Sequence, residues 1–170
     1  AWFNATYLEA QKLAKANDLF PSIMMSQAIA ESAWGQSELA TKANNLFGIK
    51  ADTTWKGAKY NTLTTEVAEV DGKVVDYTGK TISVKTGQSY KIYADFRKYN
   101  SQAESLKDYV TKLKTTMNGS AYRYQAAWRS NAKTYQNAAK ALQAGGYATA
   151  TDYATNLINR SVIYRLDTLD

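Results

Sequence analysis

Glu31 is the only charged residue in the segment LFPSIMMSQAIAESAWGQS, which spans residues 19–37. A helix that is apolar on nearly all sides is normally buried, so a single carboxyl group on it either faces a cleft or is costly to desolvate. Met24, Ala28 and Gly35 share its helical face, and such apolar or small neighbours predict a raised pKa for Glu31. A carboxyl that stays protonated near neutral pH can protonate a leaving group, so Glu31 is a candidate general acid. The simpler alternatives are a solvated position or an ion pair.

Composition narrows the chemistry that the chain can perform. It contains no histidine and no cysteine. Ser-His-Asp and Cys-His nucleophilic sites, thiolate zinc sites and histidine-bound metals are therefore excluded, and carboxyl groups remain for proton transfer. We expect no cofactor and find no metal motif, although a calcium ion held by carboxylates and carbonyls stays an open alternative.

The first half of the chain changes from a helical to a β-rich pattern. A helix is predicted near the N-terminus, a second from Pro21, which suits the first helical position, and a short third over 36–42. Residues 55–99 are rich in Thr, Val, Tyr and Ile with glycines between them, which predicts hairpins. Asp71-Gly72 is a favourable pair for a tight turn.

The remaining chain is predicted to be helical. Ser101 and Glu104 have the spacing of a capping box and open a helix whose apolar positions continue to Met117. Two more helices are predicted near 131–144 and 151–166. Helices before and after a β-rich middle indicate an α+β class.

Two motifs follow one another early in the chain, QAIAESAWG at 27–35 and NNLFGIKA at 44–51. Five further segments keep the same order: WKG at 55–57, TTE at 64–66, ADFRKY at 94–99, SLKDY at 105–109 and ALQAGGYAT at 141–149. Together they resemble the glucosaminidase domain of bacterial autolysins and flagellar peptidoglycan hydrolases, glycoside hydrolase family 73. The E-S-x-W-G element alone would be weak, because other lysozyme-like enzymes carry similar elements.

This resemblance implies a lysozyme-like architecture, mainly α-helical, with a small β-hairpin lobe that flanks the substrate cleft. We expect one catalytic domain over 1–170 with its β-rich lobe at about 55–99, since 170 residues with 45% hydrophobic content can bury a core. The implied activity is hydrolysis of the β-1,4 bond between N-acetylglucosamine and N-acetylmuramic acid in peptidoglycan, with Glu31 as general acid.

Glycoside hydrolysis usually needs a second carboxyl group, to activate water or to stabilise positive charge. Glu66 matches the family's T-x-E element and is our candidate by resemblance, with a solvent-facing strand position as the alternative. Three nearby acidic residues compete with it: Glu69, Asp71 and Asp76. If Glu66 lies on a mobile hairpin, its distance from Glu31 in one structure differs from the distance during the reaction. Retention or inversion at the anomeric carbon is therefore left open.

A substrate-assisted route, in which the 2-acetamido oxygen attacks its own anomeric carbon, is a further option. Tyr147 lies in a G-Y-A-T element that matches the family and is a candidate to orient that amide, or else a structural phenol at the last helix. Family members often continue Y-A-T-D-P, whereas this chain reads YATATD. We therefore assign Asp152 no role.

Sugar binding calls for aromatic platforms and hydrogen-bonding side chains, and the chain has 13 tyrosines and 4 tryptophans. Aromatic residues near predicted turns are better candidates than those at helical spacing, which usually belong to a core. The substrate-binding candidates are Asn44, Phe47, Trp55, Tyr122, Tyr124 and Trp128. For Asn44, a turn-forming role is an equal alternative.

The formal charge of +6 and the pI near 9.3 predict affinity for polyanions. The cations are scattered and no nucleic-acid motif is present, so the resemblance favours anionic wall polymers over nucleic acid as partners. We expect a monomer that acts outside the cell at the wall. No transmembrane segment or signal peptide is evident, so the sequence is interpreted as a mature or excised domain.

Three other functions remain open. A lytic transglycosylase or a muramidase would act on the same glycan, and the transglycosylase would release anhydro products without needing Glu66. A non-catalytic wall-binding module would use the cleft only for binding, and replacement of Glu31 would leave its function intact.

Overall fold

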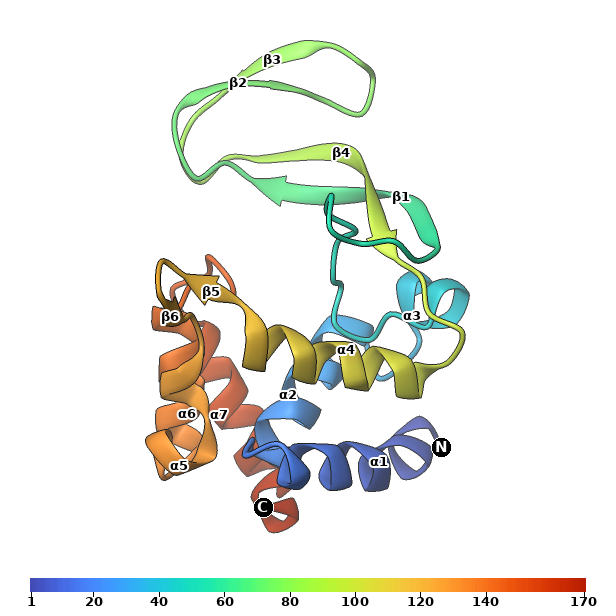
Figure 1. Ribbon diagram of the computed structural model, residues 1–170. Coiled ribbons are helices and arrows are strands. Elements are labelled where there is room, and N and C mark those ends of the chain that lie inside the picture. The colour runs from blue at the N-terminus through green and yellow to red at the C-terminus, as the bar shows by residue number, and fades with distance from the viewer.

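The computed structural model describes all of residues 1–170 and has the predicted α+β class. Its helices form one body, from which the longest strands project as a lobe, and both termini lie on the helical body (Figure 1). The helices are α1 (Trp2–Ala16), α2 (Pro21–Ser32), α3 (Glu38–Ala43), α4 (Gln102–Thr115), α5 (Arg129–Ala132), α6 (Tyr135–Ala144) and α7 (Tyr153–Ile163), with 3-10 turns η1 (Gln125–Ala127) and η2 (Leu166–Leu169). The strands are β1 (Lys59–Val67), β2 (Gly72–Val75), β3 (Thr81–Val84), β4 (Ser89–Arg97), β5 (Met117–Asn118) and β6 (Ala121–Tyr122). No helix is both long enough and apolar enough to cross a membrane.

Helix α2 is the centre of the core. Every side chain from Pro21 to Ile29 is buried, and α1, α6, α7 and η2 pack around it. Enclosure on all sides explains why this helix has no polar stripe. Ala30 and Glu31 are exposed, so the helix emerges from the core only in its last turn.

The starts of the helices follow the predicted signals. Pro21 opens α2, and Ser101 Oγ accepts a hydrogen bond from the Glu104 amide at the start of α4. The short third helix begins at Glu38 rather than at residue 36, because Ser37 caps it through the Ala40 amide. The prediction that this helix continues to Met117 is wrong. Helix α4 ends at Thr115, and Met117 lies exposed in β5.

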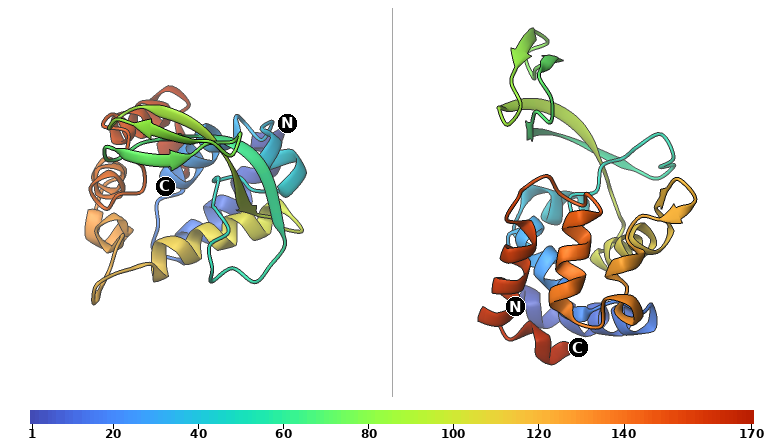
Figure 2. Two further views of the ribbon diagram at one scale, coloured as in Figure 1. Left: turned by 90° about the horizontal axis from the view of Figure 1, so that it is seen from above. Right: turned by 90° about the vertical axis from the view of Figure 1, so that its left-hand side faces the viewer.

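The lobe is built on an antiparallel pair of long strands, β1 and β4, in which Glu66 lies opposite Tyr90. The shorter β2–β3 hairpin is inserted between them. Along β1, half-buried residues alternate with exposed ones, and Glu66 belongs to the half-buried set. Viewed from above, the lobe arches across the helical body towards the side of α6 and α7 (Figure 2).

The tight turn expected at Asp71-Gly72 is wrong. Gly72 begins β2, and the turn that joins β2 to β3 lies over residues 76–80. Asp71 instead accepts hydrogen bonds from the backbone amide and hydroxyl of Thr86, across the point where the two hairpins meet. Asp71-Gly72 does not form a hairpin turn, because β1 pairs with β4, which is distant in the sequence, rather than with β2.

The C-terminal region contains three helices where two were predicted. The pattern at 131–144 divides into α5 and α6, because Lys133 adopts a positive φ of 69° and Thr134 then caps α6 through the Asn137 amide. Helix α7 lies within the range 151–166 that the sequence predicted.

Candidate active site

Glu31 lies in the last turn of α2, and the helix ends abruptly after Ser32. The next residues, Ala33, Trp34 and Gly35, all have positive φ, and the Gly35 amide donates to Ser32 Oγ at 2.8 Å. Gly48 lies beside the carboxyl group, and a Cβ atom added there would lie 3.8 Å from Glu31 Oε2. A glycine with a φ of +64° therefore leaves this flank of the carboxyl group open.

The environment of Glu31 favours its protonated form. Desolvation by burial raises its pKa, while the positive charges of Lys112 and Arg160 act in the opposite direction. Glu31 still has substantial solvent-accessible surface, although protein atoms surround much of the group. A carboxyl group that is partly desolvated yet reachable suits proton donation to a ligand.

A cavity of about 520 Å³ lies between the base of the lobe and α4, and Glu31 is not among the residues that line it. Lys112 and Tyr147 line it and also interact electrostatically with Glu31. A second cavity of about 780 Å³ shares Arg123 and Gly146 with the first. It continues between the far end of β1 and the loop before α7, so a groove runs beneath the lobe.

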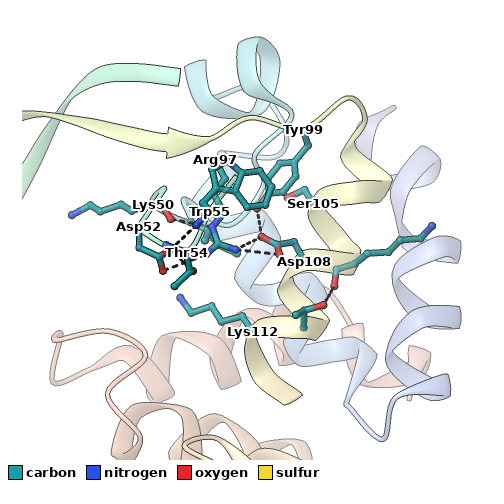
Figure 3. Close-up of polar contacts among 12 residues, drawn as sticks. Lys50, Asp52, Thr54, Trp55, Arg97, Tyr99, Ser105, Asp108 and Lys112 are labelled. Carbon is teal, nitrogen blue, oxygen red and sulfur yellow. Dashed lines mark hydrogen bonds and ion pairs between the residues drawn. The ribbon is translucent and has the colours of Figure 1, made fainter. Parts of the chain in front are cut away.

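Arg97 ties the lobe to α4 at the edge of this groove (Figure 3). Its Nη1 donates to both carboxylate oxygens of Asp108, at 3.0 and 3.2 Å, and its Nη2 lies 3.4 Å from Asp52. The Tyr99 hydroxyl donates to the same Asp108 carboxylate. The Arg97 guanidinium also lies 4.8 Å from the centre of the Trp55 ring. These contacts join β4, α4 and the segment before β1.

Glu66 lies on the half-buried face of β1 and pairs with Lys50, which lines the first cavity. Its competitors are placed differently. Glu69 is exposed beside the second cavity, Asp71 is bonded to Thr86, and Asp76 accepts bonds within the β2–β3 turn.

Tyr147 has a buried hydroxyl group without a hydrogen-bond partner. Burial raises its pKa well above the usual range, so the phenol stays protonated. Its ring lies 5.9 Å from that of Tyr153 and 5.8 Å from that of Tyr124, and Lys112 Nζ lies 4.4 Å from its centre. Asp152, to which we assign no role, precedes α7 without making a side-chain cap.

A buried amide below Glu31 connects three helices. Gln27 lies one turn before Glu31 on α2 and is fully buried. Its Oε1 accepts a hydrogen bond from the Tyr109 hydroxyl, and its Nε2 donates to the Tyr153 hydroxyl at 2.7 Å. Because Tyr153 accepts this bond, its own proton is left for another acceptor.

The other substrate-binding candidates fall into two groups. Tyr124 lines the first cavity although it is almost fully buried, whereas Trp55 stacks on the lining residue Arg97 without lining the cavity itself. Tyr122 and Trp128 form a separate pair with ring centres 5.4 Å apart and line neither cavity.

Asn44 and Phe47 have structural contacts. Asn44 ends α3 in the left-handed conformation, and its Nδ2 donates to the carbonyl group of Tyr99. Phe47 is buried in the core and stacks on Tyr109 at 4.2 Å, which places it below the groove.

Sequence reasoning missed several residues at this site, namely Gln27, Arg97, Asp108, Lys112, Arg123, Tyr153 and Arg160. Gln27 carried a local signal, since it is a long polar side chain on an otherwise apolar helix and lies four residues before Glu31. The others depend on contacts between distant elements. No group of three or more acidic side chains is placed to hold a metal ion.

Comparison with known proteins gives concordant matches. The glucosaminidase family model, described as mannosyl-glycoprotein endo-beta-N-acetylglucosaminidase, matches residues 8–167. Exo-glucosaminidase LytG of Bacillus subtilis is 37% identical over 161 residues, covering 95% of this chain and 50% of LytG. A probable N-acetylmuramidase of Lactococcus lactis subsp. cremoris is 35% identical over 176 residues, covering 100% of this chain and 35% of that protein.

The crystal structure of the catalytic domain of the autolysin Auto from Listeria monocytogenes matches with a TM-score of 0.79 and 37% identity. The match covers 99% of this chain and 85% of that one. The chain spans half or less of the length of the two curated relatives above.

Proposed function

Because the chain belongs to the glucosaminidase family of glycoside hydrolases, we propose that it hydrolyses the β-1,4 bond between N-acetylglucosamine and N-acetylmuramic acid in peptidoglycan. Its fold is the lysozyme-like α+β fold that the motifs implied. The observation that carries the proposal is the Glu31 carboxyl group, which is partly desolvated, has a raised pKa and interacts with Lys112 and Tyr147, two residues that line the groove. Such a group can protonate the departing glycosidic oxygen.

The remaining steps are assigned by chemistry. Glu66 is the proposed base or charge stabiliser, because it is the acidic residue of the lobe that lies on its half-buried face and pairs with a residue of the first cavity. Tyr147 is the proposed partner of the substrate amide, since its buried hydroxyl has no protein partner. A phenol that stays protonated can donate a hydrogen bond to that amide in a substrate-assisted route.

We further propose residues 1–170 as one catalytic domain that acts as a monomer outside the cell, at the wall. The charge of +6 supports attraction to anionic wall polymers, and we propose no role in nucleic-acid binding. Among the aromatic binding candidates, Tyr124 lines the groove, and Trp55 stacks on Arg97 at its edge.

A muramidase is the second candidate, favoured by the name of the lactococcal relative. It would cleave the alternate bond of the same glycan, with Glu31 again as the acid.

Mass spectrometry of borohydride-reduced products from digested peptidoglycan tests the proposal. Reduced N-acetylglucosamine ends are expected, whereas reduced muramic acid ends would make the enzyme a muramidase and anhydromuramic ends a transglycosylase.

Glu31→Gln should lower kcat by about 10²–10⁴-fold, the usual contribution of a general acid. Glu66→Gln should cost more activity than Glu69→Gln, its neighbour on the lobe. Intact glycan with saturable binding would instead indicate a binding module.

A further inference from the structure

Four cationic side chains line the first cavity, and only two of them have an acidic partner. Lys50 and Arg97 are neutralised by carboxylates of the lobe, of the segment before it and of α4. Lys112 and Arg123 form no ion pair and donate no side-chain hydrogen bond to the protein. Two cationic side chains of the groove are therefore without an ion-pair partner.

Lys112 is the cation next to the general acid. It is half-buried on α4 (Figure 3). Its Nζ lies 4.4 Å from the centre of the Tyr147 ring. Burial, together with the charges of Arg97 and Arg123, lowers its pKa, while the carboxyl groups of Glu31 and Asp108 act in the opposite direction. Neither Glu31 nor Asp108 forms an ion pair with Lys112, so burial of its ammonium group is only partly offset, and a bound anion would offset more of that cost.

Arg123 lies where the two cavities meet and lines both of them. Its backbone amide donates to the carbonyl group of Thr116 at 2.8 Å, which fixes its position at the end of the β5–β6 hairpin. Its guanidinium group is left to bind a ligand in the groove, and it is close enough to Lys112 for their charges to interact.

The proposed substrate carries an anion next to the bond that Glu31 would protonate. In the bond from N-acetylglucosamine to N-acetylmuramic acid, the departing oxygen is O4 of muramic acid. The adjacent carbon, C3, bears the lactyl ether, whose carboxyl group is either free or amide-linked to a stem peptide. The alternate bond, which a muramidase cleaves, departs from O4 of N-acetylglucosamine, where C3 bears only a hydroxyl group.

We propose that Lys112 and Arg123 form a carboxylate-binding site for the muramic acid residue on the leaving-group side of the cleaved bond. This inference rests on the proposed function. The carboxylate has two sources, the lactyl group of strands without peptides and the carboxylates of an attached stem. Charge-assisted hydrogen bonds from a lysine and an arginine suit both.

Matched glycan strands test the site. One sample is stripped of peptides by an amidase, which frees the lactyl carboxylate. In a second, this carboxylate is coupled to methylamine and becomes a neutral amide, and a third keeps its stem peptides. We expect kcat/KM for the free carboxylate to exceed that for the methylamide about tenfold, the effect of one charge-assisted hydrogen bond.

Lys112→Met and Arg123→Gln should each bring this ratio towards one. The ratio is informative because an effect of Lys112 on Glu31 changes both rates alike. Lys107→Met is the matched control, since Lys107 is exposed on the same helix and lines neither cavity, and it should leave the ratio unchanged.

If cleavage of stem-bearing strands depends on Arg123 while the carboxylate and methylamide strands react equally, the bound carboxylate belongs to the peptide. Equal rates on those two strands, with no loss on stem-bearing strands in either variant, would overturn the site. Binding of the three samples to Glu31→Gln gives the same comparison without cleavage. Absence of hydrolysis by the wild-type protein would thus contradict the proposed function, and the binding ratio would still decide on the carboxylate site.

Discussion

At the scale of single residues, the chemistry of Glu31 is set by opposed influences. Burial raises the pKa of its carboxyl group, and Lys112 and Arg160 partly counteract burial. A general acid must be protonated, so activity should fall as pH rises through the pKa of Glu31 in the folded protein. Lys112→Met removes a charge that lowers this pKa and should move the alkaline limb of the kcat/KM profile to higher pH. An unchanged limb in Lys112→Met, with Lys107→Met as reference, would show that another group controls it.

The raised pKa of Glu31 should also appear in the pH dependence of the free energy of unfolding. The folded protein binds the Glu31 proton more tightly than the unfolded chain, because the folded pKa is raised. The contribution of Glu31 to stability is therefore fully present below its unfolded pKa and is lost as pH rises through the folded pKa. Denaturant titrations of wild type and Glu31→Gln should accordingly diverge over this window, in favour of the variant. Parallel curves would argue against a raised pKa.

At the scale of elements, local signals predicted those features that neighbouring residues decide. Pro21 and Ser101 mark the starts of α2 and α4 because proline geometry and side-chain caps act within one turn. Glu31 could be nominated for the same reason, since its apolar surroundings are visible in one segment. The Asp71-Gly72 turn was wrong because strand pairing is decided by distant residues. Lys112 lacked a local signal, because its neighbours Glu31 and Tyr147 come from α2 and from the loop before α7.

One partly buried ion pair joins the lobe to helix α4. Arg97 at the end of β4 and Asp108 on α4 have side chains that are each only 16% exposed. Asp108→Asn would leave the Arg97 charge with only the longer contact to Asp52, at a cost of about 2–3 kcal/mol, because a buried charge loses its partner. Denaturant unfolding measures this loss, and kcat/KM should fall too, since the lobe carries Glu66.

The Lys85–Asp71 pair within the lobe is the matched control. Its side chains are 83% and 59% exposed, and solvent screens their attraction. Lys85→Met should leave both stability and activity unchanged. If Asp108→Asn were equally silent, the lobe would be held by its backbone bridge at Lys50 and Phe96 and by hydrogen bonds such as that from Tyr60 to Glu38 rather than by this pair.

At the scale of the whole molecule, the net charge of +6 acts over a longer range than the two cations of the groove. Attraction to a polyanionic wall sums over the surface and is screened by salt, with a Debye length of about 10 Å at 0.1 M and about 3 Å at 1 M. At low salt, the protein should be retained more strongly on walls that carry teichoic acid than on stripped walls, and the difference should vanish near 1 M. Arg123→Gln removes one of 21 cationic side chains and should barely change this retention, although it alters the preference for carboxylate-bearing glycan. Co-sedimentation with both wall preparations measures the effect. Equal retention at low salt would contradict attraction by the whole surface and leave binding to the groove alone.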